Sequence, residues 1–308
     1  MVRFVGLCMV GPGKTTSSIG IRFHKDANAD DVDALVASCV MKTFGTCILM
    51  RGRGLRVESN LFATSTIAVH ISDWPDNPDQ VDPMHAPPWG SRAYFISANR
   101  VHTCSWFVKN SGPDSHPLWG LMLTDNLMDI GDRLFEGACR ASVIANNVVC
   151  HADHDCLRFI DKCWETTITG NVLSGAWGGD TPSFGIWFSC SVVDVTVSNN
   201  VISHTGKDAI VFSEGPHQDI AIVGNTIRNI ALDGTSVASR GAIRFGGSAD
   251  RVTITGNSLR VQTNGVLYGV LCWNGGTLDN SMIVGNTTNA DNGVYKPASI
   301  GPGTKVYQ

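Results

Sequence analysis

Short segments of alternating apolar and polar residues return along the whole chain. The clearest is "VTVSNNVISHTGKDAIVF" (Val195–Phe212), where one Asn has an aliphatic residue three positions before it and an apolar residue two positions after it. The same arrangement recurs at Asn60, Asn99, Asn126, Asn147, Asn171, Asn200, Asn225, Asn257 and Asn286, although the last has Thr288 in the apolar position. Alternation with a period of two predicts β-strands, and a return every roughly 20–40 residues predicts stacked coils rather than a two-layer domain.

A second column of positions ends in an aromatic residue. The segments "GDRLF", "DCLRF", "FGIWF", "DAIVF", "GAIRF" and "GVLCW" end at Phe135, Phe159, Phe188, Phe212, Phe245 and Trp273. Because successive side chains of a strand point to opposite faces, we expect these aromatic rings inside the coils. The residues just before them then face outward, and these are Leu134, Arg158, Trp187, Val211, Arg244 and Cys272.

The recurring Asn has a structural explanation. A coil must turn sharply between two of its strands, and Asn tolerates the left-handed conformation that such corners use. Coils stacked about 4.8 Å apart allow successive Asn side chains to hydrogen-bond to one another as a ladder. We therefore assign the Asn column to the architecture and not to catalysis.

The composition agrees with one long solenoid. Hydrophobic residues make up 43% of the chain and charged residues 16%, and neither a linker nor a low-complexity segment interrupts it. The net charge of −4 and the lack of a Lys/Arg-rich run argue against a nucleic-acid or membrane partner. The opening "MVRFVGLCMVGPGKTT" has a short apolar run broken by "GPG", so we expect no signal peptide. Among the ten cysteines, Cys139 and Cys163 should stack in adjacent coils as buried thiols.

One segment carries a resemblance to a known family. The stretch "DANADDVDALVASCVMKTFGTCILMRGRGLRV" (Asp26–Val57) resembles the opening of pectate-lyase-like β-helix proteins, most of all bacteriophage tailspikes. In that family a short helix precedes the first coils, and here "ADDVDALVASCV" supplies the helical pattern. The expected fold is all-β: a single right-handed parallel β-helix with a short N-terminal capping α-helix. We expect an N-terminal extension over 1–20, the β-helix over 21–290 and a C-terminal tail over 291–308.

The resemblance also implies a function. The family's usual ligand is a long polysaccharide, and the likeness to tailspikes implies a homotrimer on a virus particle that binds and cleaves bacterial surface glycans. We expect a virion protein, assembled in the host cytoplasm, that acts as a polysaccharide hydrolase or lyase without a cofactor. Another virion subunit, contacted through the N-terminus, is a further expected partner. A non-catalytic glycan-binding spike and a structural virion subunit are the open alternatives.

Four residues are candidates for binding the substrate. Arg158, Trp187 and Arg244 are expected on one outer wall, where an aromatic ring can stack on a sugar and Arg can bind carboxylates as a fork. Trp177 lies in the insert "SGAWGGDTPS", and long loops on a rigid scaffold commonly carry function. Such a wall suits an acidic sugar chain. Ordinary long side chains on a surface strand are the alternative, and for Trp177 a subunit interface.

Four carboxylates are candidates for catalysis. Asp155 and Asp208 stand four residues before the aromatic column and two coils apart, which predicts about 9.6 Å between their backbones. Asp161 and Glu214 repeat this offset two residues after the aromatic column. Inverting glycosidases hold an acid and a base ~6.5–9.5 Å apart. Since Arg158 favours ionisation of its neighbour Asp155, we expect Asp208 to be the general acid. Turn-capping is the alternative role for each carboxylate.

The segment "HADHD" (His151–Asp155) is the densest group of titratable residues. Its Asp side chains could bind calcium, and a solvated turn explains it equally well. We assign no metal.

Overall fold

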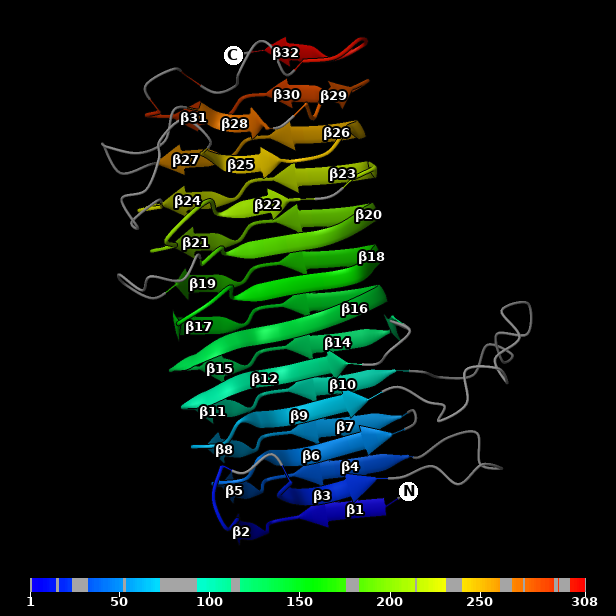
Figure 1. Cartoon of the computed structure of the whole chain (residues 1–308), viewed down its shortest axis with the longest axis vertical. Coiled ribbons are helices and arrows are strands. Elements are labelled where there is room, and N and C mark those ends of the chain that lie inside the picture. Colours follow the sequence, from blue (N-terminus) through cyan, green and yellow to red (C-terminus); the bar gives the residue numbers. More distant parts are fainter. Residues whose placement is uncertain are drawn as a thin grey trace, which may run out of the picture.

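The structure is a computed structural model of the 308-residue chain. It describes residues 2–14, 17–23, 33–51, 54–72, 93–111, 117–175, 183–213, 215–230, 240–260, 268–273, 275–290, 293 and 300–307. The described residues form strands stacked along one axis, from β1 at the N-terminal end to β32 at the C-terminal end (Figure 1). Every strand pairing is parallel, so the chain is a parallel β-solenoid whose coils stack on one another.

The strands form three stacks that run along the solenoid. The first stack contains β1 (Val2–Val5), β4 (Ala34–Ala37), β7 (Leu55–Glu58), β10 (Tyr94–Ser97), β13 (Leu118–Trp119), β14 (Leu121–Thr124), β23 (His217–Val223), β26 (Ala249–Thr255), β29 (Leu278–Asp279), β30 (Met282–Val284) and β32 (Lys305–Tyr307). The second stack contains β2 (Cys8–Val10), β5 (Val40–Lys42), β8 (Leu61–Ala63), β11 (Arg100–His102), β15 (Leu127–Met128), β17 (Val148–Ala152), β19 (Val172–Gly175), β21 (Val201–Ser203), β24 (Thr226–Arg228), β27 (Ser258–Arg260) and β31 (Thr287–Thr288).

The third stack holds the aromatic column. It contains β3 (Ile19–Phe23), β6 (Thr46–Arg51), β9 (Ile67–Ser72), β12 (Cys104–Ser111), β22 (Ile210–Phe212), β25 (Gly241–Phe245) and β28 (Tyr268–Cys272). Three long strands, β16 (Gly131–Ala145), β18 (Leu157–Thr169) and β20 (Ile186–Ser198), belong to the third stack in their first half and to the first stack in their second half.

The predicted Asn ladder is confirmed. From Asn60 to Asn257, each Nδ2 donates to the Oδ1 of the next ladder Asn at 2.8–3.0 Å, and all nine Asn residues are buried. The left-handed residue, however, is the one immediately before the ladder Asn, as at Ser59 (φ 57°) and Asn199 (φ 55°). The ladder Asn therefore satisfies buried backbone groups, and its neighbour makes the turn.

The aromatic column packs as predicted through most of its length. Phe188, Phe212 and Phe245 stack with ring centroids 4.6 and 4.7 Å apart and are fully buried. Cys139 and Cys163 are register partners with their Sγ atoms 3.8 Å apart, as expected. Regular stacking of similar side chains in successive coils packs the solenoid interior layer upon layer.

Two details of the aromatic column were predicted wrongly. Phe245 pairs with Cys272 rather than with Trp273, so the last coil is shifted by one residue, Cys272 is buried and Trp273 is exposed. At the other end of the column, Phe135 pairs with Leu157 rather than with Phe159, ahead of a bulge between Gly137 and Cys139, and Leu134 is buried. A one-residue shift exchanges the two faces of a strand, which is why the expected orientations of Cys272 and Trp273 are reversed.

The expected capping helix is not observed, and the described residues contain no helix at all. Positions 29–32 of the expected helical segment lie outside the described residues, whereas Ala34–Ala37 and Val40–Lys42 form β4 and β5. β4 pairs with β1 on one side and with β7 on the other, so tertiary pairing overrides the helical pattern. The paired strands β1 and β32 also extend the coils beyond the expected limits at residues 21 and 290. Within the described part of the chain, no helix could cross a membrane.

Candidate functional site

The outer side of the third stack carries charged and aromatic side chains along much of its length, some of them buried. We call it the third-stack wall, and it consists of Trp106, Lys109, Arg133, Glu136, Asp155, Arg158, Phe184, Trp187, Asp208 and Arg244. The backbone register places Lys109, Glu136, Arg158 and Trp187 directly beside one another on successive strands, and Val211 and Arg244 follow on the next two. The wall therefore runs parallel to the solenoid axis.

Glu136 is the centre of a cluster of cations. Its carboxylate accepts an ion pair from Arg133 Nη1 at 2.9 Å, from Arg158 Nη1 at 3.6 Å and from Lys109 Nζ at 3.6 Å. The Glu136 residue is only 8% exposed. Burial of a carboxylate is costly unless cations compensate it, so Glu136 holds these three side chains together at the middle of the wall.

The aromatic residues of the wall stack with these cations. Lys109 Nζ lies 4.0 Å from the centroid of the Trp106 ring, and Arg158 Cζ lies 4.4 Å from that of Trp187. The Trp187 ring also packs against Phe184 at 5.3 Å, and its Nε1 donates to Ser213 Oγ at 2.6 Å. These contacts fix the orientation of Trp187, with its indole nitrogen occupied and its ring part of the outer surface.

Asp155 and Asp208 occupy equivalent places two coils apart, as predicted. Asp155 Oδ1 accepts a hydrogen bond from the backbone N–H of Phe184 at 2.9 Å, and Asp208 Oδ1 accepts one from that of Gly241 at 2.8 Å. The two residues are 1% and 2% exposed. Each carboxylate thus binds the backbone of the next coil, which is the capping role that the sequence left open as the alternative.

Each of these buried carboxylates also faces an arginine. Arg133 Nε lies 3.5 Å from Asp155 Oδ2, and Arg244 Nε lies 3.1 Å from Asp208 Oδ2. Burial raises the pKa of both carboxyl groups, and the neighbouring arginines and backbone N–H groups oppose that rise. The expectation that Asp208 is the general acid considered only Arg158 beside Asp155; in the structure Asp208 has an arginine of its own, and Arg244 is nearer to Asp208 than Arg133 is to Asp155.

The other predicted site residues do not join the wall in the described structure. Asp161 is exposed and has a left-handed backbone (φ 67°) in the middle of β18, beyond the turn of the strand. Glu214 and Trp177 lie outside the described residues. Of the predicted wall, Arg158, Trp187 and Arg244 are in place, whereas Val211 lies between Trp187 and Arg244 and is fully buried.

Sequence reasoning missed Glu136, Arg133, Lys109, Trp106 and Phe184. The segment "GDRLFE" was aligned on Phe135 with Leu134 outside, whereas the register pairs Glu136 with Arg158. The signal that could have found Glu136 is its charge, since a charged residue beside the aromatic column is more readily placed outward than Leu134.

Several N–H groups of the wall lack an acceptor. Trp106 Nε1 and the Nε atoms of Arg133, Arg158 and Arg244 are buried and have no hydrogen-bond partner in the described part of the chain. Arg133 and Arg244 Nε reach only ion-pair contact with Asp155 and Asp208. Buried donors without acceptors are rare in proteins, so this part of the wall is unusual in its hydrogen bonding.

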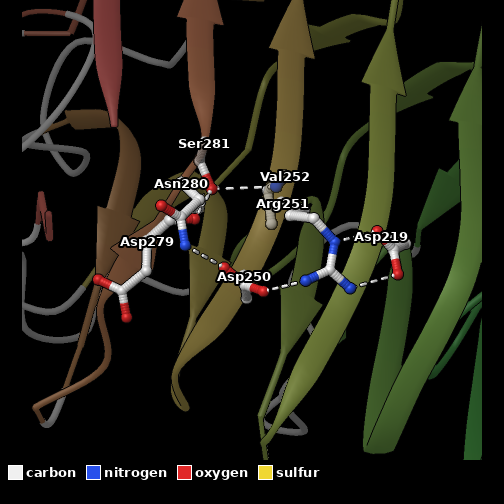
Figure 2. Close-up of polar contacts among 7 residues, drawn as sticks. All are labelled: Asp219, Asp250, Arg251, Val252, Asp279, Asn280 and Ser281. Atoms are coloured by element: carbon white, nitrogen blue, oxygen red, sulfur yellow. Dashed lines mark hydrogen bonds and ion pairs between the residues drawn. The ribbon is translucent and has the colours of Figure 1, made fainter. Parts of the chain in front are cut away.

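A second group of charges lies at the exposed corner of the first stack (Figure 2). Arg251 donates from Nε and Nη2 to the two carboxylate oxygens of Asp219 at 2.6 and 2.7 Å, and it also pairs with Asp250. Asn280 Nδ2 donates to Asp250 Oδ1 at 2.8 Å. These side chains are solvent-exposed and bind one another, so they form a surface network of small energetic weight.

Comparison with solved structures identifies the fold. The chain resembles the A-module of mannuronan C-5 epimerase AlgE6 from Azotobacter vinelandii, with a TM-score of 0.52 and 14% identity over 100% of this chain and 90% of that chain. It resembles bacteriophage CBA120 tailspike protein 3 with a TM-score of 0.53 and 13% identity, over 99% of this chain and 50% of that one. DFA-IIIase from Arthrobacter chlorophenolicus A6 gives a TM-score of 0.51 and 13% identity, over 87% of this chain and 70% of that chain.

These likenesses establish a parallel β-helix, as the resemblance of the sequence implied. The chain spans about half of the tailspike chain that it matches. No protein-family model matches the sequence, and no curated protein matches it.

Proposed function

We propose that the chain binds an anionic polysaccharide along the third-stack wall. The observation that carries this proposal is the pair of arginines on the wall, Arg158 and Arg244, whose side chains stay 29% and 20% exposed on either side of Trp187. An anionic ligand could contact their guanidinium groups without displacing the existing ion pairs.

The charge of the wall selects an anionic chain. Four cationic side chains face three carboxylates, and each carboxylate is already in contact with at least one arginine. The wall therefore has an excess of positive charge on a protein whose net charge is −4. Arg158 and Arg244 remain partly exposed, with 29% and 20% of their side chains accessible, so their guanidinium groups can receive carboxylates or sulfates in a fork.

The direction of the ligand follows from the register. The cationic side chains of the wall extend from Lys109 on β12 to Arg244 on β25, which is five coil steps or about 24 Å along the axis. A polymer that lies parallel to the axis meets these cations in succession, and the Trp187 ring provides a stacking surface between Arg158 and Arg244. The solved epimerase and tailspike of the same fold are consistent with a long glycan as the ligand.

We propose further that the protein is a virion spike that cleaves a bacterial surface polysaccharide, with Asp155 and Asp208 as the acid–base pair. Their coil positions imply about 9.6 Å between backbones, close to the ~6.5–9.5 Å between carboxyl groups in inverting glycosidases. One group would protonate the glycosidic oxygen, and the other would deprotonate the attacking water. Raised pKa values suit the group that donates the proton. Asp161 and Glu214 remain the alternative pair.

A binding-only spike is the second candidate. It is favoured by the burial of Asp155 and Asp208 and by the backbone N–H group that each of them holds, since a capping carboxylate needs no substrate. A glycan lyase and a structural virion subunit are distinguished from both candidates by the same measurements.

A panel of charged and neutral bacterial glycans tests the proposal. We expect binding to anionic glycans that weakens with salt, and reducing ends that accumulate with time. An unsaturated product would indicate a lyase, and binding without product would indicate an adhesin. Arg158→Gln should weaken binding by about tenfold or more, whereas Arg251→Gln, which changes an exposed arginine at another corner, should not. Equal binding by the wild type and Arg158→Gln would exclude the wall as the site.

A further inference from the structure

The second stack carries a pair of arginines of its own, apart from the third-stack wall. Arg228 on β24 and Arg260 on β27 are register partners on neighbouring strands, and both are exposed. The residues before them, Ile227 and Leu259, are buried, so the two arginines project from the same outer face with their backbones about 4.8 Å apart. Like charges directly opposite each other destabilise a sheet, so the pair is unfavourable unless an anion neutralises it.

No carboxylate neutralises this pair within the described residues. The strands β19, β21, β24, β27 and β31 follow one another along one edge of the solenoid (Figure 1), and Arg228 and Arg260 are the only charged residues in them. Neither arginine forms an ion pair in the described part of the chain. Arginines that do contact a carboxylate are Arg133, Arg140, Arg158, Arg244 and Arg251. On a protein with a net charge of −4, an arginine pair without a counter-charge indicates a place for an external anion.

His204 lies beside the pair at the corner that follows β21. Its Nε2 is 3.3 Å from Asn229 Nδ2, and its Nδ1 is 3.2 Å from Ser203 Oγ. Burial lowers the pKa of His204 below its ordinary value, and the charges of Arg228 and His151 lower it further. The imidazole therefore lies within the positive field of Arg228, so its titration reports on an anion bound there.

The chemistry of the pair selects a phosphate group. A single guanidinium group can hold a carboxylate through two parallel N–H···O bonds, which leaves the second arginine without a partner. A phosphate monoester has a charge of about −1.5 to −2 at pH 7 and three strong acceptor oxygens, so it can accept from two guanidinium groups at once. The planar fork of arginine also matches the geometry of phosphate.

We propose that Arg228 and Arg260 form a phosphate-binding site on the second stack, for a phosphate that is either free or carried as a substituent of a polysaccharide. The site lies on a different stack from the third-stack wall and shares no residue with it. It is therefore independent of the proposed glycan binding along the wall, and either assignment can be wrong while the other holds.

Calorimetry and melting curves at low ionic strength test the proposal. The probes are inorganic phosphate, an oligosaccharide that carries one phosphate monoester, the same oligosaccharide without phosphate, and acetate. We expect the wild type to bind both phosphate probes, and to bind acetate at least ~tenfold more weakly because a carboxylate engages only one arginine. Arg228→Gln and Arg260→Gln should each weaken phosphate binding about tenfold or more.

The melting curves distinguish lost binding from lost folding. Each substitution removes the repulsion between the two arginines, so neither variant should melt below the wild type in phosphate-free buffer. Phosphate that binds the folded state should raise the Tm of the wild type, and this rise should disappear in both variants.

The matched control is Arg100→Gln. Arg100 is an exposed arginine of the same stack, and its register partners Leu61 and Leu127 are uncharged, so it belongs to no arginine pair. This variant should bind phosphate as the wild type does. Arg158→Gln, which weakens the proposed glycan binding, should not weaken phosphate binding either. In the wild type, phosphate should raise the pKa of His204 in an NMR titration, since a nearby anion favours the charged imidazole.

The two phosphate probes separate the sources of the ligand. Equal affinity for both would identify free phosphate as sufficient, and tighter binding of the phosphorylated oligosaccharide than of either phosphate or the unmodified sugar would identify a polysaccharide substituent. A wild type that binds neither phosphate probe overturns the proposal. So does phosphate binding that survives in both arginine variants, or that falls equally in Arg100→Gln.

Discussion

Arg244 Nε lies 3.1 Å from Asp208 Oδ2, while the other oxygen of Asp208 accepts the backbone N–H of Gly241 at 2.8 Å. One buried carboxylate therefore fixes both a side chain of the wall and the start of β25. The same arrangement occurs two coils earlier, where Asp155 faces Arg133 and accepts from Phe184. Any catalytic use of these carboxylates must coexist with this structural use.

Asp208→Asn separates the proposed catalytic role of Asp208 from its structural role as the acceptor for the Gly241 backbone N–H. The amide oxygen of Asn can still accept from Gly241, so we expect the fold and glycan binding to persist. If Asp208 is the general acid, turnover should fall by about 10²-fold or more. Product formation on the cleaved glycan is the measurement, and calorimetric binding is the control. Full activity in this variant, together with its loss in Asp161→Asn or Glu214→Gln, would move the site to the alternative pair.

Glu136→Gln is expected to act in opposite directions on stability and on binding. Removing the charge leaves Lys109, Arg133 and Arg158 without their shared carboxylate, and their mutual repulsion should destabilise the fold by about 1–3 kcal/mol. The same loss makes the wall more positive, so an anionic glycan should bind several-fold more tightly at low salt. Chemical denaturation and calorimetry measure the two effects. Weaker binding would instead mean that Glu136 contacts the ligand or positions Arg158 for it.

The repeated features of the fold could be predicted from the sequence because each occupies the same structural position in every coil. The ladder Asn must bridge to the next Asn, and Phe188, Phe212 and Phe245 must fill equivalent layers, so both columns recur visibly. The shifted register at Trp273 was not accessible, since "GVLCW" fits the alternation with either residue inside. The expected helix was wrong for a related reason. Ala34–Ala37 forms a strand because β1 and β7 pair with it on both sides, and the spacing of residues within this segment does not reveal those partners.

The candidate site was predictable in part. Asp155 and Asp208 share one column, and Arg158, Trp187 and Arg244 share another, so simple periodicity places them. The bonds that these residues make were not predictable, because their partners come from other coils and from a bulge. Arg133 enters the wall where β16 loses the alternation of buried and exposed residues, which has no signature in the sequence, whereas Glu136 follows Phe135 in regular alternation.

Substitution of a ladder Asn should lower the unfolding free energy most in the middle of the ladder. Asn200 accepts from the side chain of Asn171 at 2.9 Å and from its backbone N–H at 3.0 Å, and it donates to Asn225 Oδ1 at 3.0 Å. Asn200→Ala leaves these buried groups unpaired and should cost about 3 kcal/mol or more of unfolding free energy. Asn286→Ala at the end of the ladder removes as many side-chain hydrogen bonds, but Asn286 is 8% exposed, so water can reach the groups left unpaired and the loss should be smaller. Equal losses in urea denaturation would mean that the ladder does not act as a connected network.

His217 should make the fold sensitive to acid. It lies inside the solenoid with 1% exposure, its ring 5.4 Å from that of Phe212, and neither ring nitrogen has a hydrogen-bond partner in the described structure. Burial lowers the pKa of His217 from 6.5 to about 4. Between these values the unfolded chain binds a proton that the folded chain does not. His217 therefore leaves stability intact above about pH 6.5 and removes up to roughly 3 kcal/mol as the pH falls to 4.

The buried carboxylates act in the opposite sense. Folding raises the pKa values of Asp155 and Asp208, so the unfolded chain loses these two protons at a lower pH than the folded chain does. Their contribution to the unfolding free energy therefore becomes less favourable as the pH rises. The unfolding free energy of the wild type alone therefore mixes the two effects. The difference between the wild type and His217→Leu isolates the histidine, since both proteins retain the two carboxylates. This difference should change between pH 6.5 and 4 as His217 becomes unfavourable in the wild type, and a difference that stays constant over that range would show that His217 is not held neutral by burial.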